Sequence, residues 1–433
     1  MPTMYFRTQE HTVPACHIRE YPASTAHSQE EVLHLHVKQY TPLDTTDPPA
    51  DAVTLVGAHA IGFPKELYEP LWDELYQRSK AQGFSIRGIW IADVANLGLS
   101  SVLNEGKLGN DASWMDHSRD LLLMINHFRE QMPRPIVGIG HSFGGCQMIN
   151  LSLMHPRLLS SLILLDPVIQ LSPNEAVLST NPPGMLNVVT YRRDLWPSRQ
   201  TAAANLAKSP MFASWDKRVF ERMVRYGLRD LPTPLYPDPP SEHAATDPPV
   251  TLTTTKHQEI RTLIRQNYHN RDPSGHIRID RSTHADLDPF AAFIPLYRPE
   301  PGATFLRLAA VRPSVLFLVG GASELKVDEL REGIKVTGTG VGGGGGMADG
   351  RVKEVTLPGR GHLFPLEIVE ETAQECAEWL GQEVARWRDE QDKWERERVE
   401  RSGSDGMIID EAFKEIVKPP RMARRPANTQ AKL

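Results

Sequence analysis

The feature that most constrains the fold is an alternation of short apolar runs with longer amphipathic runs, between about residues 53 and 166. The short runs are β-branched or leucine-rich and end at turn residues, which is typical of buried strands. The longer runs, at 66–83 and 113–132, carry apolar residues at helical spacing. Because strands that alternate with helices form a parallel sheet, the sequence predicts an α/β fold. The predicted strands are 53–58, 86–94, 135–140 and 161–166.

After residue 166 the alternation stops. Helical stretches follow one another without intervening strands, and a proline-rich segment interrupts them at 231–249. We therefore expect a large and mainly helical insertion, which would act as a lid. Its predicted helices lie around 199–210, 214–228 and 256–268.

The strand pattern returns with 314–321 and 351–359, and a long helix follows over 366–400. The last turns of this helix are almost entirely charged, which indicates a solvent-exposed end or a surface that pairs with a second copy of the chain. These patterns divide the chain into a discontinuous core, a lid inserted before the penultimate strand and a flexible C-terminal tail. The expected boundaries are 1–166 with 311–398 for the core, 167–310 for the lid and 399–433 for the tail.

A glycine-rich stretch at 338–346 contains the spacing Gly-x-Gly-x-x-Gly, which in dinucleotide-binding proteins opens a helix. Here no helical pattern follows, so the stretch offers no helix N-terminus to a pyrophosphate. We interpret it as a flexible linker, and we expect no cofactor.

One serine lies where a strand pattern meets a helix pattern. Ser142 follows the predicted strand 135–140 and stands between Gly140 and Gly144 in the motif GHSFG. A strand-to-helix turn this tight strains the backbone at the serine and brings its neighbours close together, which explains glycine at two-residue spacing on both sides. The helix N-terminus would stabilise negative charge beside the hydroxyl. We predict that Ser142 is a nucleophile.

A serine nucleophile needs a general base, and the base needs an orienting acid. In the chain order serine, acid, histidine, the base follows the last strand, where the sequence has His362 after Gly361. The chain has 16 histidines, and no other has this placement. His141, beside the serine, is expected to pack within the turn. We predict His362 as the base.

Two carboxylates are candidates for the orienting acid. Ser323 occupies the position after strand 314–321 where many such enzymes carry the acid, and the adjacent Glu324 is one candidate. The other is Asp166, which ends the preceding strand at a known alternative position for the acid. An apolar strand that runs directly into an aspartate would otherwise bury an unpaired charge. We favour Asp166 and keep Glu324 as the alternative.

Backbone N–H groups are expected to bind the oxyanion that forms during acyl transfer. One is the N–H of Phe143, directly after the nucleophile. The second belongs to the loop after strand 53–58, where the sequence HAIG at 59–62 resembles a His-Gly-x turn with alanine in the glycine position. We expect Ile61 to donate, with Ala60 as the second choice.

Composition limits the partners and the compartment. The chain of 433 residues has 40% hydrophobic and 24% charged residues, typical of a globular protein, and a net charge of -6 that gives no general attraction to nucleic acid. Cys16, Cys146 and Cys376 are too scattered for a disulfide framework or a metal site, which favours a reducing compartment. The chain shows neither a signal peptide nor an apolar run of membrane-spanning length. We expect no nucleic acid, metal or membrane span.

The chain ends in Ala431, Lys432 and Leu433, a conservative variant of the Ser-Lys-Leu peroxisomal address. The polar, proline-bearing segment before it should leave the tripeptide exposed for an import receptor. We predict delivery to the peroxisomal matrix, or a cytoplasmic location if the tripeptide is not read.

Six segments carry a family resemblance: 57–75, 112–122, 140–145, 161–167, 191–199 and 361–367. Together they resemble the α/β-hydrolase superfamily over about residues 50–395. More narrowly, they look like the fungal peroxisomal hydrolases of secondary-metabolite pathways, of the mycophenolic-acid-pathway acyl-CoA hydrolase type. This resemblance implies an acyl-CoA thioesterase whose acid follows the sixth strand, at Asp166.

The predicted lid adds an independent indication of a large anionic substrate. Residues 191–230 contain nine Lys or Arg against four Asp or Glu, so this part of an acidic protein is locally basic. Such cations suit the phosphates of CoA, although a solvated helix face has the same composition. The candidates are Arg192, Arg193, Arg199, Lys208, Lys217, Arg218 and Arg222. Candidates for lining an apolar acyl site, each of which is otherwise a core residue, are Phe143, Met148, Trp196, Phe212 and Trp215.

These observations predict a cofactor-free serine hydrolase that releases a free acid and CoA from an acyl-CoA, in a lipid or secondary-metabolite pathway. A peroxisome shortens acyl-CoA chains, so a serine hydrolase delivered there meets thioesters. The first alternative is a carboxylesterase, lactonase or carbon–carbon bond hydrolase with the same triad. The second, of another class, is a non-catalytic binding or scaffold protein that forms a homodimer through the charged C-terminal helix.

Overall fold

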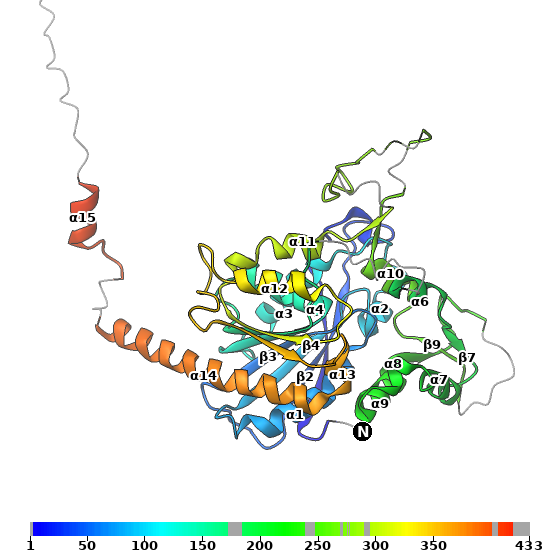
Figure 1. Ribbon diagram of the computed structural model, residues 1–433, viewed down its shortest axis with the longest axis horizontal. Coiled ribbons are helices and arrows are strands. Elements are labelled where there is room, and N and C mark those ends of the chain that lie inside the picture. The colour runs from blue at the N-terminus through cyan, green and yellow to red at the C-terminus, as the bar shows by residue number, and fades with distance from the viewer. Residues whose placement is uncertain are drawn as a thin grey trace, which may run out of the picture. The chain divides into compact units, whose positions relative to one another are not determined.

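A computed structural model shows an eight-stranded sheet in the order β1-β2-β4-β3-β5-β6-β12-β13 (Figure 1). The six strands from β4 to β13 are parallel, whereas β2 is antiparallel to both of its neighbours. All six strands expected from the sequence are present, which confirms the predicted α/β fold. The strands are β1 (Phe6–Pro14), β2 (His34–Pro42), β3 (Val53–Ala58), β4 (Ile86–Ala92), β5 (Ile136–His141), β6 (Ser161–Leu165), β12 (Ser314–Gly320) and β13 (Val352–Leu357).

The structure describes residues 3–171, 184–238, 247–268, 272–274, 276, 278–289, 295–400 and 406–418. The chain forms two compact units, Met1–Val384 and Ala385–Leu433, and the sheet belongs to the first. The division falls inside helix α14 (Val369–Glu400), in which no residue from 385 to 399 is buried. The second unit also contains the short helix α15 (Glu411–Val417).

Strands β1 and β2 were missed by the sequence reasoning. In β2, buried Leu35 and Val37 alternate with the partly exposed His34 and His36. Every second side chain at this end of the strand therefore points into the core. That period-two pattern was the available signal, and the two histidines and Lys38 weakened it. β1 is an edge strand, and the exposed middle of the strand consists of polar residues. It therefore lacks the apolar pattern by which the other strands were predicted.

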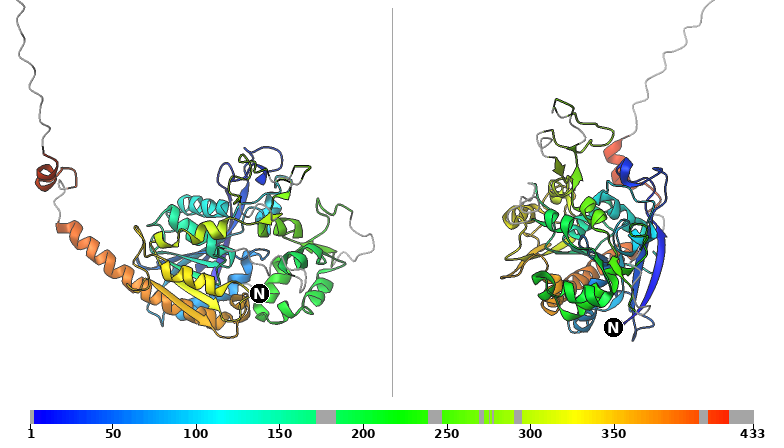
Figure 2. Two further views of the ribbon diagram at one scale, coloured as in Figure 1. Left: turned by 45° about the horizontal axis from the view of Figure 1, so that its top comes forward. Right: turned by 90° about the vertical axis from the view of Figure 1, so that its right-hand side faces the viewer.

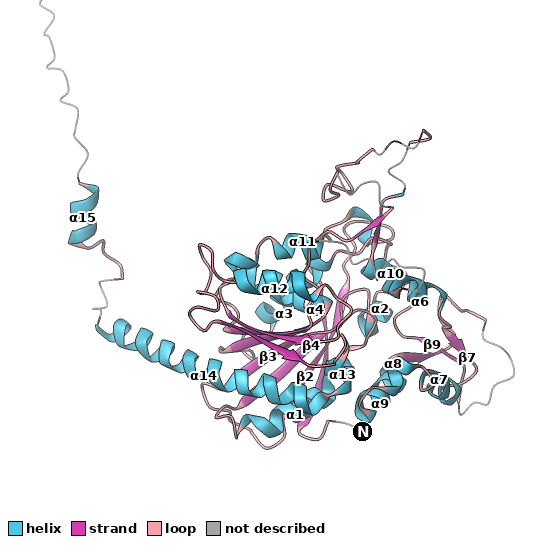
Figure 3. Ribbon diagram, viewed as in Figure 1, coloured by secondary structure: helices cyan, strands magenta, loops and turns pink. Residues whose placement is uncertain are grey.

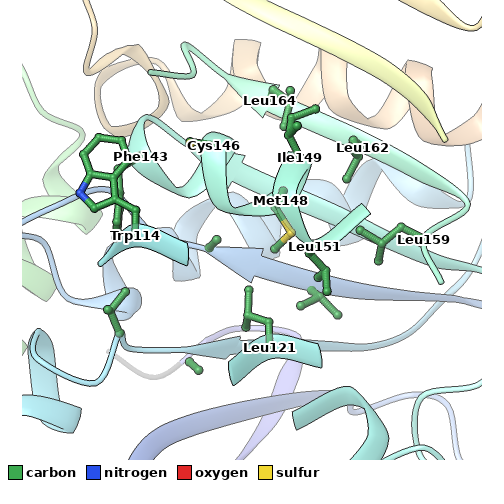
Figure 4. Packing of buried hydrophobic residues seen from close by; sticks show 14 of the residues in the cluster. Trp114, Leu121, Phe143, Cys146, Met148, Ile149, Leu151, Leu159, Leu162 and Leu164 are labelled. Atoms are coloured by element: carbon green, nitrogen blue, oxygen red, sulfur yellow. The ribbon is translucent and has the colours of Figure 1, made fainter. Parts of the chain in front are cut away.

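Helices cover both faces of the sheet (Figure 3). Residues of α3, α4 and α12 form one apolar cluster with the sheet, and residues of α1 and of α14 up to Val384 form the other. Figure 4 shows Met148, Ile149 and Leu151 of α4 alongside Leu162 and Leu164 of β6. Every residue of β3, β5, β6 and β12 is buried, which explains their continuous apolar runs. The core helices are α1 (Glu69–Ser79), α2 (Gly98–Leu103), α3 (Trp114–His127), α4 (Phe143–Met154), α12 (Val327–Val336) and α13 (Phe364–Glu367).

The insertion lies between β6 and β12, before the penultimate strand as expected. Figure 2 shows its green part, α6 to α10, at one end of the sheet. Besides helices it contains two small sheets that the sequence did not suggest, β7-β9-β8 and β10-β11. Its helices are α6 (Met185–Tyr191), α7 (Arg199–Leu206), α8 (Pro210–Ala213), α9 (Lys217–Tyr226), α10 (Lys256–Leu263) and α11 (Glu300–Phe305). Its strands are β7 (Leu195–Trp196), β8 (Leu228–Asp230), β9 (Val250–Leu252), β10 (Arg265–Gln266) and β11 (Leu296–Tyr297).

The prediction that the glycine stretch 338–346 is a flexible linker was wrong. The N–H groups of Gly338, Gly340 and Gly344 donate to carbonyl oxygens of residues 308–311 at 2.8 to 3.0 Å. A Cβ atom added at Gly343 would lie 2.3 Å from the carbonyl oxygen of Gly338, so the backbone segments approach too closely for any side chain. The stretch is a packed loop, and the strand β13 follows it.

The packed loop predicts the effect of Gly343→Ala. The added methyl group meets two carbonyl oxygens, so we expect the free energy of unfolding to fall by about 1–3 kcal/mol, as in other overpacked sites. Chemical denaturation beside the wild type measures this change. Gly406→Ala is the control, because open space surrounds its Cβ atom and a surface substitution costs about 0.5 kcal/mol or less. Equal effects of the two substitutions would contradict the packed loop.

Candidate active site

The parallel strands bring the predicted catalytic residues to one edge of the sheet. Ser142 directly follows β5, Asp166 directly follows β6, and His362 lies in the loop after β13. Because the carboxyl ends of parallel strands meet at the same edge, residues far apart in the sequence become neighbours there.

Ser142 stands on the tight turn that the sequence predicted. Its backbone has φ 59° and ψ -121°, a region that residues other than glycine rarely adopt. A Cβ atom at Gly140 would lie 2.4 Å from the carbonyl oxygen of Gly144, and one at Gly144 would lie 2.3 Å from that of Ala58. The flanking glycines are therefore required by the approach of α4 to the ends of β5 and β3.

The side chains of Ser142, His362 and Asp166 are joined by two hydrogen bonds. His362 Nε2 lies 2.8 Å from Ser142 Oγ, and His362 Nδ1 lies 2.7 Å from Asp166 Oδ2. A carboxylate only accepts, so Nδ1 carries the proton and Nε2 is left to accept from the serine hydroxyl. This is the arrangement in which imidazole acts as a general base toward serine.

Burial and the carboxylate act in opposite directions on His362. Burial of the ring lowers the pKa of His362, but the hydrogen bond to Asp166 and the charge of that carboxylate outweigh it, and the net pKa is raised above 6.5. Exposed Glu324 adds a smaller increase through its charge. The carboxylate that hydrogen-bonds to the ring is thus Asp166, and Glu324 acts on His362 only as a nearby charge.

Asp166 is fully buried, and its charge is satisfied by three donors. Besides His362, the backbone N–H of Gly320 donates to Oδ1 at 2.9 Å and the hydroxyl of Ser323 donates to Oδ2 at 2.6 Å. The sequence reasoning noted Ser323 at the position where an acid often stands but assigned it no role. The structure shows that this hydroxyl holds the carboxylate in place.

The loop after β3 is held by its own side chains. The N–H of Ala60 donates to the hydroxyl of Tyr68 at 3.0 Å, so it is not available to an oxyanion. His59 Nδ1 donates to the carbonyl oxygen of Ala60 at 2.8 Å. That carbonyl shares a peptide plane with the N–H of Ile61, and the two groups of a trans peptide point in opposite directions. Within the described residues, the N–H groups of Ile61 and Phe143 donate to no other protein group, which leaves both as candidate donors.

Four of the seven cations proposed for CoA are already engaged within the protein. Arg192 pairs with buried Glu259, and Arg222, which is itself buried, pairs with Glu69 of α1. Their charges are satisfied by acidic residues distant in the sequence, so the expectation that they contact phosphates is not supported. Arg199 bonds to Asp230 and to carbonyl oxygens of the insertion, and Arg218 pairs with Asp216 and Glu74. Of the seven, the remaining three, Arg193, Lys208 and Lys217, are exposed and have no ion-pair partner among the described residues.

The apolar candidates separate into two groups. Phe143 and Met148 are fully buried in the core, and Trp196 is buried in a small cluster of the insertion, where its indole N–H donates to Asn205. These three are packing residues. Trp215 is also buried, but its ring contacts Phe63, which directly follows the loop of Ile61; the Phe63 and Trp215 ring centroids are 5.2 Å apart. The ring of Phe212 contacts Trp215.

Two hydrogen bonds join residues 214–216 to helix α13, the segment that follows His362. The N–H of Asp216 donates to the carbonyl oxygen of Leu366 at 2.9 Å, and the hydroxyl of Ser214 donates to Glu367 at 2.7 Å. The sequence reasoning did not single out Phe63, because its neighbour Trp215 lies about 150 residues further along the chain.

The predicted targeting tripeptide, Ala431, Lys432 and Leu433, lies outside the described residues. None of the described helices is long and apolar enough to cross a membrane.

Comparison with known proteins identifies the class. The model of the alpha/beta hydrolase family matches residues 55–379, and the chain belongs to this family. A type I acyl-CoA thioesterase, mpaH of Penicillium roqueforti (strain FM164), is 51% identical over 436 residues, which cover 99% of each chain. The type I acyl-CoA thioesterase mpaH' of Penicillium brevicompactum is 50% identical over 441 residues, covering 100% of each chain. The chain is therefore an enzyme of the hydrolase class.

Among solved structures, the peroxisomal alpha-beta-hydrolase Lpx1 of Saccharomyces cerevisiae superposes with a TM-score of 0.62 at 19% identity. The match covers 91% of this chain and 99% of that one. At this level of identity the likeness shows a shared fold alone.

The raised pKa of His362 predicts the pH dependence of hydrolysis. Only the neutral ring accepts a proton, so kcat/KM should rise with pH as the imidazolium ionises, with an apparent pKa above 6.5. In Asp166→Asn the rise should move to lower pH, because the charge that stabilises the imidazolium is lost, and the maximal rate should fall by about 10²- to 10⁴-fold. A pH–rate profile of each variant measures both effects.

The control for Asp166→Asn is Glu324→Gln, which removes the other carboxylate near the ring. It should shift the profile only slightly and leave most of the activity. If Glu324→Gln abolished activity while Asp166→Asn did not, the assignment of the acid to Asp166 would be wrong.

Proposed function

We propose that this hydrolase is an acyl-CoA thioesterase that works through an acyl-enzyme on Ser142. The proposal rests on one observation above all: His362 hydrogen-bonds to a serine on one side and to a buried carboxylate on the other. The identity of about half of all residues with type I acyl-CoA thioesterases, over the full chain, supports the choice of a thioester as substrate.

In the first half of the reaction, Ser142 Oγ attacks the thioester carbonyl carbon while His362 Nε2 takes the hydroxyl proton. The carbonyl oxygen becomes an oxyanion, which accepts hydrogen bonds from the N–H groups of Phe143 and Ile61. The carbon–sulfur bond then breaks, and the proton passes from His362 to the CoA sulfur. Asp166 keeps the ring in the required tautomer and stabilises its charged form.

In the second half, a water molecule gives a proton to His362 Nε2 and attacks the acyl carbon. The bond between that carbon and Ser142 Oγ breaks, and the same proton returns to the serine. The products are a carboxylic acid and free CoA. No cofactor is needed, because every proton that moves is held by His362 at some stage.

For the site of action we propose the peroxisome. The support is the terminal tripeptide Ala431, Lys432 and Leu433, since a small residue, a cation and a leucine match the type of address that the import receptor reads. The basic residues Arg193, Lys208 and Lys217 are the remaining candidates for contact with the CoA phosphates.

Release of free thiol from a panel of acyl-CoAs tests the thioesterase proposal. We expect release by the wild type and a loss of at least about 10³-fold in Ser142→Ala, because removal of the nucleophile leaves only the oxyanion donors and binding. Labelling by a fluorophosphonate, which reacts with an activated serine, should be present in the wild type and absent in Ser142→Ala. Cleavage of oxygen esters without any thiol release would instead identify an esterase with the same triad, and absence of both activities and of labelling would point to a non-catalytic protein.

A second experiment tests the compartment. A fluorescent protein fused to the N-terminus of the full chain should collect in peroxisomes, and deletion of the last three residues should leave it in the cytosol. Replacement of Leu433 by Ala is the milder variant and should have the same effect. Unchanged location after deletion would contradict the role of the tripeptide.

A further inference from the structure

Two buried residues outside the triad connect the loops of the candidate site. Tyr68 is the last residue of a short 3-10 helix (Lys65–Tyr68), and His141 is the last residue of β5. The Tyr68 hydroxyl lies 3.0 Å from the N–H of Ala60 and 2.8 Å from His141 Nδ1. His141 Nε2 lies 3.0 Å from the carbonyl oxygen of His362. The four groups form one continuous hydrogen-bonded chain.

The protons in this chain have only one arrangement. The backbone N–H of Ala60 must donate, so the Tyr68 oxygen accepts from it and uses its own hydrogen toward His141 Nδ1. The carbonyl oxygen of His362 only accepts, so His141 Nε2 carries the hydrogen of the neutral ring. Each donor thus has one acceptor, and all donations run in one direction from Ala60 to His362.

A charged His141 would break this order. Protonation of Nδ1 would place two donors face to face, because Tyr68 already donates there. Burial lowers the pKa of His141 to about 3, and the neighbouring His362, whose ring centroid is 5.3 Å away, lowers it as well. His141 is therefore neutral in this chain, and both of its ring nitrogens are engaged by protein groups.

The chain joins three segments that come from different strands. Ala60 precedes Ile61, the candidate oxyanion donor in the loop after β3. His141 precedes the nucleophile Ser142 at the end of β5, and His362 carries the base in the loop after β13. Tyr68 and His141 thus connect the loop after β3 to the loop after β13, in addition to the direct hydrogen bond between His362 and Ser142.

We propose that Tyr68 and His141 are positioning residues for hydrolysis. They hold two loops in place relative to Ser142: the loop after β3, which carries Ile61, and the loop after β13, which carries His362. This inference rests on the proposed serine mechanism. The carbonyl oxygen of His362 is fixed by His141, while its ring is fixed by Asp166, so the base is held at both its backbone and its side chain. The N–H of Ala60 is fixed by Tyr68, while His59 fixes its carbonyl oxygen, so the peptide that carries the Ile61 N–H cannot rotate.

Tyr68→Phe tests the proposal with the smallest change. It removes one oxygen, and it leaves the Ala60 N–H without its acceptor and His141 Nδ1 without its donor. Because the misplaced groups act in the transition state, kcat should fall by about 10- to 100-fold while KM changes less than about twofold. The rate of fluorophosphonate labelling of Ser142 should fall in parallel, since that reaction uses the same nucleophile and oxyanion site.

Tyr21→Phe is the matched control. It also removes a buried hydroxyl, one that donates to Asp286 and contacts Glu300, but it lies outside the three loops. It should leave kcat and the labelling rate within about twofold of the wild type, as expected for a substitution away from the reacting groups. A fall in kcat no larger in Tyr68→Phe than in Tyr21→Phe, or an effect carried by KM alone, would overturn the proposal.

His141 is tested by rescue. Glutamine presents an acceptor and a donor at its end, so His141→Gln should retain at least about tenfold more activity than His141→Leu, with thermal melting used to compare only folded variants. Equal activity of the two variants would show that His141 acts by its volume alone. If the wild type itself showed neither hydrolysis nor labelling, the serine mechanism would fail, an outcome distinct from activity in the wild type that is insensitive to Tyr68 and His141.

Discussion

The hydrogen bond between the buried carboxylate of Asp166 and His362 Nδ1 is the interaction on which the candidate site depends. A fully buried charge is costly unless several donors satisfy it, and here three donors come from the ends of two strands. The N–H of Gly320 and the hydroxyl of Ser323 lie at and after the end of β12, and the imidazole of His362 follows β13. Satisfying this one carboxylate therefore brings the loops after β6, β12 and β13 together. It also sets the tautomer of His362 and leaves Nε2 to accept from Ser142, so the contact that stabilises the buried charge also orients the imidazole.

Asp166 follows β6, whereas Ser323 follows the neighbouring strand β12. β6 and β12 are adjacent and parallel, so the residues after their ends lie side by side. Asp166 Oδ2 is bonded both to His362 Nδ1 and to the hydroxyl of Ser323, so the residue after β12 supports the carboxylate after β6. Ser323 is this support, with a hydroxyl that donates where a second carboxylate would repel. The strained backbone of Asp166, with φ 44°, and of Ser142 shows that both residues are held by their surroundings rather than by local preference.

The insertion shows what a local count of charges leaves out. Its basic excess suits the phosphates of CoA as well as a solvated helix face, whereas in the structure Arg192, Arg218 and Arg222 pair with Glu259, Glu74 and Glu69. Two of these acids belong to α1, about 150 residues earlier, so the local count of charges could not include them. The same reason applies to the glycine stretch, whose close neighbours are carbonyl oxygens of residues 308–312. Charge and packing are decided by what lies opposite in space, and only the fold supplies that.

The sequence by itself determined the α/β class, the six parallel strands, the turn at Ser142 and the placement of His362, because each of these is recorded in residues close to one another along the chain. Apolar periodicity marks the strands, and the glycines beside Ser142 mark the tight turn. The tertiary structure placed Asp166, and not Glu324, in hydrogen-bond contact with His362, gave Ser323, Tyr68 and His141 their partners, and showed that the Ala60 N–H is already used. These outcomes depend on hydrogen bonds between residues up to 221 positions apart, whose geometry no local pattern encodes.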